Sequence, residues 1–219
     1  MSDPGPEGSD GGAGPPVAVV GLLGGQWFGR AAETALRQAD VLLGHARQFA
    51  VLPADIGGER VELWGDLDAL MTRAAAEQAA GRRCCILADG DPGFHGPLAV
   101  AGRRLGEDGL AVHPAPSSIA LAFARVGTTW HDAVVASARH SMERTVDTVI
   151  GHPKVAVLVT PDQPPEVVGR ALVAAGCGER AVTVCSRLAE EGEHVVRTDL
   201  AGLAGGTFDP VSVVVLRAP

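Results

Sequence analysis

The chain has 219 residues, of which 46% are hydrophobic and 20% are charged, and its formal net charge is −8. This length suits one large domain or two small ones. The acidic balance argues against nucleic-acid partners and against a polybasic membrane anchor. Without a run of about 18 apolar residues, we expect no transmembrane helix.

The N-terminus and the cysteines indicate a cytoplasmic protein. The first residues lack the basic-then-apolar order of a signal peptide. None of Cys84, Cys85, Cys177 and Cys185 belongs to a Cys-x-x-Cys pair, and the histidines show no zinc-binding spacing. We therefore expect reduced cysteines and no metal site.

Apolar runs alternate with helix-like stretches through the first half of the chain. Residues 1–16 are mostly Gly, Pro, Ser and acids, which predicts a disordered tail. Continuous apolar runs are typical of strands in a buried parallel sheet, and they occupy 17–20, 40–43, 84–88 and 110–113. Amphipathic stretches predict helices at 29–38, 67–80 and 98–108. This alternation predicts an α/β fold with right-handed crossovers.

The second half repeats the pattern. Strands are predicted at 133–137, 155–159, 181–185 and 211–216, and helices at 117–126, 143–150 and 166–175. Pro165 is expected in the first turn of the last helix, and Gly176 just past its end. A proline-rich hinge at 113–116 predicts two α/β lobes, over residues 17–114 and 115–219.

The strongest local signal is the segment Gly90-Asp91-Pro92-Gly93-Phe94-His95-Gly96, which follows a predicted strand and precedes a predicted helix. In open α/β sheets, ligands bind beyond the carboxyl ends of the strands. Glycines allow a ligand to approach the backbone, and Asp91 could accept hydrogen bonds from a ligand amine or hydroxyl. By itself the segment is equally compatible with a polar turn.

Two further loops are weaker signals. Ser117 and Ser118 begin a predicted helix, where they could cap it or bind an anionic group. Glycines also follow the first strand, at Gly21, Gly24 and Gly25. They do not form the Gly-x-Gly-x-x-Gly pattern, and no Gly-Lys-Ser/Thr follows, which argues against a nicotinamide oxidoreductase or a nucleotide triphosphatase.

Taken together, the motifs resemble the tetrapyrrole methylases, and most closely the precorrin or cobalt-precorrin-7 C5-methyltransferases. The resemblance extends over about residues 17–216. It is carried by Val19-Val20-Gly21, by the Ala39–Gly44 segment with Arg47-Gln48 and Leu52-Pro53, by Gly90–Gly96, by Pro116–Ala124, and by the Trp130-x-Asp132 block. The Gly-Asp-Pro turn marks the superfamily, whereas the ordered set indicates the C5 branch.

The resemblance implies a two-lobed fold with mostly parallel or mixed sheets and an active-site cleft between the lobes. It implies S-adenosyl-L-methionine (SAM) as the methyl donor and S-adenosyl-L-homocysteine (SAH) as the product. The cofactor-binding residues would be Leu22, Gly90, Asp91, Pro92, Gly93, Phe94, Ser117, Ser118, Ile119 and Thr160.

The implied reaction is C5 methylation of precorrin-7 or cobalt-precorrin-7 in cobalamin biosynthesis. His95 and His140 are candidate bases. Because the tetrapyrrole carries many carboxylates, Arg47, Arg125, Arg139 and Arg144 are candidate substrate-binding residues, and we expect a positive cleft in an acidic protein. The resemblance also suggests a homodimer and a C15-methylating decarboxylase as a partner.

Two positions depart from the family pattern. Relatives usually carry Gly-x-Gly-x-Asp-Gly after the first strand, and here Gly25 takes the place of the acid. Relatives tend to read His-Gly-Arg where this chain has Arg139-His140-Ser141. A methylase for another tetrapyrrole position or scaffold, and a catalytically silent ligand-binding homologue, therefore remain alternatives.

Overall fold

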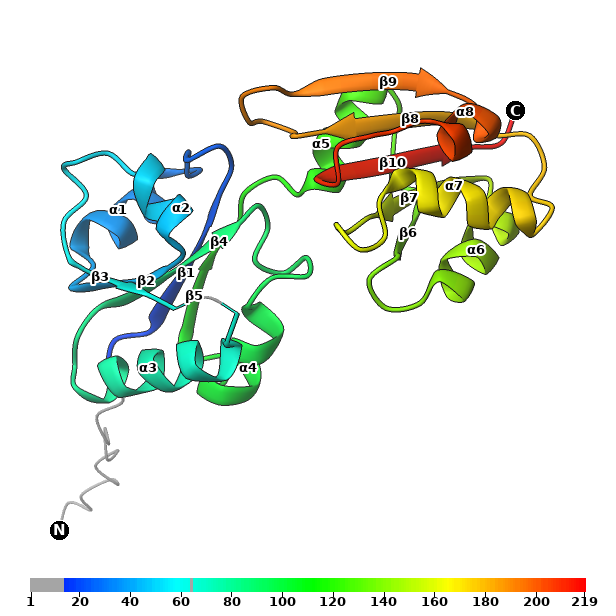
Figure 1. Cartoon of the computed structure of the whole chain (residues 1–219). Coiled ribbons are helices and arrows are strands. Elements are labelled where there is room, and N and C mark those ends of the chain that lie inside the picture. The colour runs from blue at the N-terminus through cyan, green and yellow to red at the C-terminus, as the bar shows by residue number, and fades with distance from the viewer. Residues whose placement is uncertain (1–13, 64) are drawn as a thin grey trace, which may run out of the picture. The chain divides into compact units, whose positions relative to one another are not determined.

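The structure is a computed structural model that describes residues 14–63 and 65–219 (Figure 1). The predicted tail over residues 1–16 therefore falls mostly outside the described residues. The described chain divides into two compact units, and the division falls between Pro116 and Ser117. We refer to them as unit 1 and unit 2.

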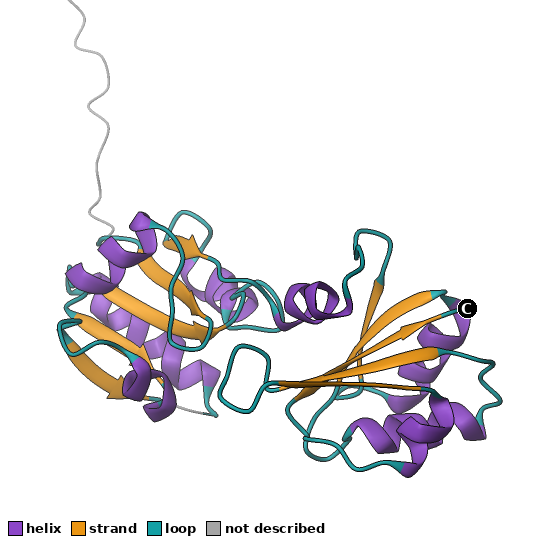
Figure 2. Ribbon diagram, turned by 90° about the horizontal axis from the view of Figure 1, so that it is seen from above, coloured by secondary structure: helices purple, strands orange, loops and turns teal. Residues whose placement is uncertain are grey.

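Unit 1 is a parallel sheet with helices on both faces (Figure 2). Its five strands lie in the order β3-β2-β4-β1-β5, and every pairing is parallel. This confirms the predicted α/β class. The elements are β1 (Val17–Leu22), α1 (Arg30–Gln38), β2 (Val41–Gly44), α2 (Ala46–Val51), β3 (Glu59–Glu62), α3 (Leu67–Ala79), β4 (Cys84–Asp89), α4 (Leu98–Leu105) and β5 (Leu110–His113).

The core of unit 1 lies on both faces of the central strands. Every residue of β1 is buried. Val20 and Leu22 pack with α1 and α2 on one face, whereas Val17 and Val19 pack with α3 and α4 on the other. A strand covered on both sides must be apolar at every position, which explains why this run was recognisable in the sequence.

Unit 2 contains a mixed sheet in the order β6-β7-β10-β8-β9, in which β6 and β7 are parallel and the other pairs are antiparallel. One face packs against α6, α7 and α8, and α5 contacts β8 and β10. The elements are α5 (Ser118–Val126), β6 (Val134–Ser137), α6 (Met142–Gly151), β7 (Lys154–Leu158), α7 (Pro165–Ala174), β8 (Ala181–Ser186), β9 (His194–Thr198), α8 (Leu200–Gly205) and β10 (Ser212–Arg217).

Helix ends follow the predicted signals. The Ser117 hydroxyl accepts a hydrogen bond from Ala120 N at 3.2 Å, so it caps α5. Helix α7 begins at Pro165, and Gly176 follows its C-cap with φ +71°. The prediction of a helix to residue 108 was wrong: α4 ends at Leu105, because Gly106 takes φ +75° and stops the helix.

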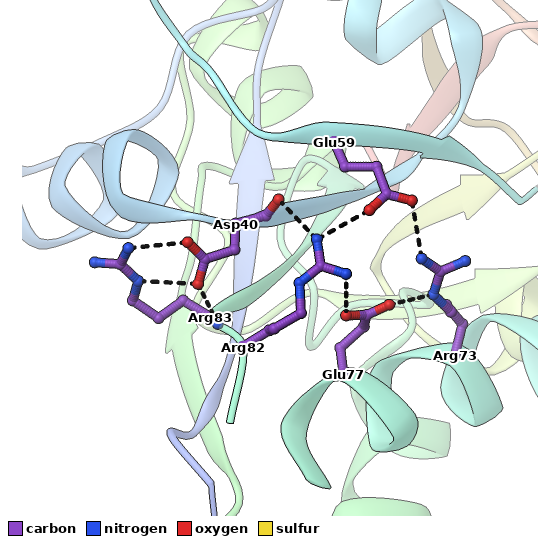
Figure 3. Close-up of polar contacts among 6 residues, drawn as sticks. All are labelled: Asp40, Glu59, Arg73, Glu77, Arg82 and Arg83. Carbon is purple, nitrogen blue, oxygen red and sulfur yellow. Dashed lines mark hydrogen bonds and ion pairs between the residues drawn. The ribbon is translucent and has the colours of Figure 1, made fainter. Parts of the chain in front are cut away.

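A network of arginines and acids joins β2, β3 and α3 at the end of the sheet where β2 begins (Figure 3). The buried Glu77 carboxylate pairs with Arg73 and with Arg82, the latter at 2.8 Å. Glu59 pairs with the same two arginines at 3.0 and 2.9 Å. Asp40 accepts hydrogen bonds from the Arg83 guanidinium and from Arg83 N.

This network predicts a loss of stability in acid. The Arg83 guanidinium lowers the pKa of Asp40 from 3.8 to about 2, and the Arg82 guanidinium lowers the pKa of Glu59. A carboxyl whose pKa falls on folding stabilises the fold above its unfolded pKa, and that contribution disappears as the pH falls through the folded pKa. In urea unfolding between pH 6 and pH 2, we expect the midpoint of the native protein to fall more steeply below about pH 4 than that of Asp40→Asn. Parallel curves would contradict this assignment.

Candidate functional site

The parallel strands of unit 1 bring the predicted ligand loops to one edge of the sheet. Strands β1, β2, β4 and β5 end at Leu22, Gly44, Asp89 and His113, and their registers place these ends together. We call this the carboxyl edge of unit 1. In parallel α/β sheets, this edge is where ligands bind.

The loop after β4 is held in a defined conformation. Gly90, with φ +68°, donates its N–H to Leu22 O at 2.7 Å, which joins the loop to the end of β1. Asp91 Oδ1 accepts from Gly93 N at 2.8 Å, and Phe94 N donates to Asp91 O at 3.0 Å. Gly93 N binds Oδ1 of the carboxylate, so Oδ2 is the oxygen that a ligand would reach.

Gly21 allows three segments to approach one another at this edge. A Cβ at Gly21 would lie 2.1 Å from Gly90 O and 2.7 Å from Ala115 N. The backbone of β1 therefore lies against both the loop after β4 and the loop after β5, with no side chain between them. Gly21 and Ala115 are buried and Gly90 is partly buried, so this junction fixes the positions of the two loops against β1.

The predicted base His95 lies in the same loop. It has φ +56°, which is uncommon for a residue other than glycine, and its ring packs edge-to-face on Phe94 with the ring centroids 4.9 Å apart. The side chain is exposed. A second histidine, His113, ends β5 at the same edge, and burial lowers the pKa of its imidazole. The sequence reading did not single out His113.

The glycine loop after β1 forms one side of a hollow of about 390 Å³, which Trp27, Val51 and Pro53 also line. Gly25 has φ +82°, and a Cβ there would lie 2.8 Å from the Val51 Cβ. The position at which the family pattern predicts an acid therefore has no room for a side chain unless Val51 moves.

Replacing Gly25 with aspartate is therefore expected to lower the free energy of unfolding by about 1–3 kcal/mol, because the new side chain meets Val51 and the backbone is strained. Urea unfolding would measure this. Val51→Gly removes the side-chain atoms that the new Cβ meets, so Gly25→Asp should cost less in the Val51→Gly background than in the native protein. An unchanged midpoint for Gly25→Asp alone would show that the loop re-forms around an acid.

In unit 2, several predicted residues line a second hollow of about 500 Å³. It lies where the parallel strands β6 and β7 end, and its walls include Arg139, His140 and Thr160. Thr160 and Gln163 exchange backbone hydrogen bonds at 3.2 and 2.9 Å across a tight turn. The hollow also contains residues that the sequence reading did not select: Ala138, Ser141, Met142, Pro161, Asp162 and Gln163.

Other predicted residues of unit 2 have different surroundings. The Arg125 guanidinium pairs with Glu193, which partly offsets its charge. Arg144 is exposed on α6 and does not line the hollow. Ile119 is fully buried, so its side chain belongs to the core, and Ser118 is half-buried at the start of α5.

Neither a metal centre nor a membrane segment emerges from the described part of the chain. In residues 14–63 and 65–219, no group of three His, Cys, Asp or Glu side chains could hold a metal ion. Within the same residues, no helix is long and apolar enough to cross a membrane. Burial raises the pKa of the Cys84 thiol to about 12, so this side chain is not a thiolate at neutral pH.

Comparison with known proteins identifies relatives of the chain. A cobalt-precorrin-7 C(5)-methyltransferase of Salmonella typhimurium is 31% identical over 179 residues, which are 82% of this chain and 87% of that protein. A decarboxylating precorrin-6Y C(5,15)-methyltransferase of Sinorhizobium sp is 28% identical over 205 residues. These cover 92% of this chain and 48% of that relative.

A solved structure shows the same fold. The uroporphyrin-III C-methyltransferase of Thermus thermophilus, complexed with S-adenosyl homocysteine, aligns with a TM-score of 0.69 at 19% identity. The alignment covers 92% of this chain and 97% of that one. Finally, the family described as Tetrapyrrole (Corrin/Porphyrin) Methylases matches residues 17–204. The chain therefore belongs to the tetrapyrrole methylase family.

Proposed function

We propose that the protein is a SAM-dependent C-methyltransferase that methylates C5 of precorrin-7 or cobalt-precorrin-7 in cobalamin biosynthesis. The observation that carries this proposal is the carboxyl edge of unit 1, where the Gly90-Asp91-Pro92 loop lies against β1 and leaves Asp91 Oδ2 available. The 31% identity to the Salmonella typhimurium enzyme supports the choice of ring position.

The residues at this edge fit the cofactor. SAM carries an ammonium group and ribose hydroxyls, all of which are donors, and a carboxylate at which backbone N–H groups can point. Asp91 offers a carboxylate oxygen to the donors. Gly90 and Gly93 carry no side chain that would keep a ligand from the loop, and their own N–H groups are bonded to Leu22 O and Asp91 Oδ1. When bound, SAM supplies an electrophilic methyl group on a sulfonium.

The protein promotes methyl transfer by aligning the methyl group with the substrate. A nucleophilic ring carbon of the reduced macrocycle must face the methyl group in line with the carbon–sulfur bond. Fixing two reactants in this way contributes up to roughly 7–11 kcal/mol in favourable cases. His95 at the carboxyl edge and His140 in the hollow of unit 2 are the candidate acceptors for the proton that the ring must lose.

Arginine side chains can bind the carboxylates of the substrate. Arg47 lies at the carboxyl edge of unit 1, and Arg139 lines the hollow of unit 2. Both guanidinium groups are exposed and can bind carboxylates in a bidentate manner. We propose these two as substrate-binding residues, with Ser117 and Thr160 among the cofactor contacts.

The test is methyl transfer from SAM labelled with ¹³C at its methyl group. Purified protein with precorrin-7 should give a product that is heavier by one methylene and shows one new labelled methyl signal by NMR. The position of that signal would separate C5 from another ring position. Binding of SAH without transfer to precorrin-7 or cobalt-precorrin-7 would support a silent homologue instead.

We also propose the assembly that the family suggests, a homodimer that works beside a C15-methylating decarboxylase. The Sinorhizobium sp relative is named for both C5 and C15 methylation and is about twice as long as the matched region. Light scattering would give the oligomeric state. Coupled turnover with a separate decarboxylating methyltransferase would test the partner.

A further inference from the structure

A chain of hydrogen bonds at the carboxyl edge of unit 1 connects α2 to the end of β4. Gln48 Nε2 donates to Asp89 Oδ1 at 3.1 Å, and Arg47 Nη2 donates to Asp89 Oδ2 at 3.2 Å. Asp89 is the residue directly before the Gly90-Asp91-Pro92 loop. The Arg47 guanidinium is thereby attached to the strand that leads into the proposed cofactor loop.

Gln48 is the buried residue in this series of hydrogen bonds. Its side chain is only 4% exposed, and Oε1 accepts from His45 N at 2.9 Å while Nε2 reaches Asp89. Gly44 makes room for it, since a Cβ there would lie 2.7 Å from Gln48 Oε1. A buried amide with both ends bonded has one orientation, so it holds Asp89 in a defined position.

The Arg47–Asp89 pair itself contributes little to stability. The two side chains are 61% and 53% exposed, and ion pairs with such exposure stabilise a fold only weakly. A guanidinium has five N–H donors, and only Nη2 is used here. The Arg47 side chain is exposed, so the N–H groups that Asp89 does not engage can bind a planar anion.

We propose that Gln48 and Asp89 are positioning residues, which hold the Arg47 guanidinium at the carboxyl edge so that it binds a side-chain carboxylate of the substrate. The inference rests on the proposed function, because it takes the substrate to be a tetrapyrrole with free carboxylates. The inference adds to that function the residues that orient Arg47, and it names a side-chain carboxylate as the substrate group that Arg47 binds.

Two variants, Asp89→Asn and Gln48→Glu, test whether these residues position the Arg47 guanidinium. Asp89→Asn keeps an acceptor for Gln48 but removes the anion that holds Arg47. Gln48→Glu keeps the oxygen that accepts from His45 N and turns the donor toward Asp89 into a repelling oxygen. The matched control is Asp55→Asn, which breaks another exposed ion pair of unit 1, with Arg37 at 2.7 Å.

The first measurement is binding of cobyrinic acid, a corrin with free carboxylates, compared with cobinamide, whose side chains are amides. Both variants should bind cobyrinic acid about tenfold more weakly, the effect of one lost charge-assisted contact. Binding of cobinamide and of SAH should not change, and Asp55→Asn should behave as the native protein. If Asp89 only neutralised Arg47, Asp89→Asn would bind cobyrinic acid more tightly, and that result would overturn the proposal.

The second measurement is turnover of precorrin-7, which distinguishes this inference from the proposed function. Both variants should raise KM about tenfold and leave kcat within about twofold, because the contact serves binding. If the native protein methylates precorrin-7 and both variants keep its KM, the positioning role of Gln48 and Asp89 is overturned and the proposed function stands. If the native protein does not methylate precorrin-7, the C5 assignment is overturned. If both variants nevertheless lose binding of cobyrinic acid and not of cobinamide, the positioning role is supported.

Discussion

Replacing Gly21 with alanine is expected to lower the free energy of unfolding by about 3 kcal/mol, the upper end of the cost of overpacking a core. The new Cβ would lie 2.1 Å from Gly90 O and 2.7 Å from Ala115 N, and both of these are backbone atoms. A backbone atom cannot rotate away as a side chain can, so β1 or the loop after β4 must shift. Urea unfolding followed by circular dichroism would measure the change.

The matched control is Gly102→Ala, which should have the opposite sign. Gly102 lies within α4, and nothing lies within 4 Å of the place where its Cβ would be. Alanine there should stabilise the protein by about 0.5–1 kcal/mol, because glycine is a poor helix former. If Gly21→Ala unfolded at the same urea concentration as the native protein, the contact between β1 and Gly90 would not constrain the fold.

The same substitution should also weaken binding of the cofactor. The Gly90 N–H donates to Leu22 O, next to Gly21, and Gly90 begins the loop that carries Asp91. A shift of this loop moves Asp91 relative to the end of β5. We therefore expect Gly21→Ala to weaken SAH binding even under conditions in which the variant is fully folded.

The elements that the sequence predicted are those with a continuous or periodic apolar pattern. Strand β1 is apolar at nearly every position because helices cover both faces of its sheet. The elements that it missed lack such a pattern. Strands β3 and β9 are at the edges of their sheets and mostly exposed, so their residues are largely polar. Helices α2 and α8 have only six residues each, too few to show a period.

One missed element did carry a local signal. His45 and Gln48 form a capping box at the start of α2, in which Gln48 Oε1 accepts from His45 N and His45 Nδ1 accepts from Arg47 N. The usual sequence signature has Ser, Thr, Asp or Asn in the first place, so a histidine there is easily overlooked. The pair Arg47-Gln48 served only to recognise the family.

The candidate site could be predicted where it depends on one loop and not where it depends on the tertiary fold. Gly90, Asp91 and Gly93 are neighbours in sequence, so the motif alone predicts that they form one ligand-binding loop. The approach of Arg47 to Asp89, across 42 positions of the chain, follows from the pairing of β2 with β4. The hollow of unit 2 likewise joins Arg139 after β6 to Asp162 and Gln163 after β7.

Replacing Asp91 with alanine is expected to weaken SAH binding about 100-fold, and asparagine about tenfold, as measured by calorimetry. Alanine removes the carboxylate and also the acceptor of the Gly93 N–H, so the loop loses its internal hydrogen bond. Asparagine retains that bond through its side-chain oxygen and replaces Oδ2 by a donor. The difference between the two variants therefore measures how much of the affinity comes from the shape of the loop.

The charge of Asp91 accounts for the remainder, and a ligand without the amino group checks this. If Oδ2 receives the ammonium group of the ligand, the tenfold loss in Asp91→Asn should shrink when the amino group is absent from the ligand. Adenosine-based thioethers without that group provide the comparison, since they should bind the native protein and Asp91→Asn almost equally. Equal losses for both ligands would assign Oδ2 to a ribose hydroxyl, and native SAH affinity in both variants would remove Asp91 from the cofactor site.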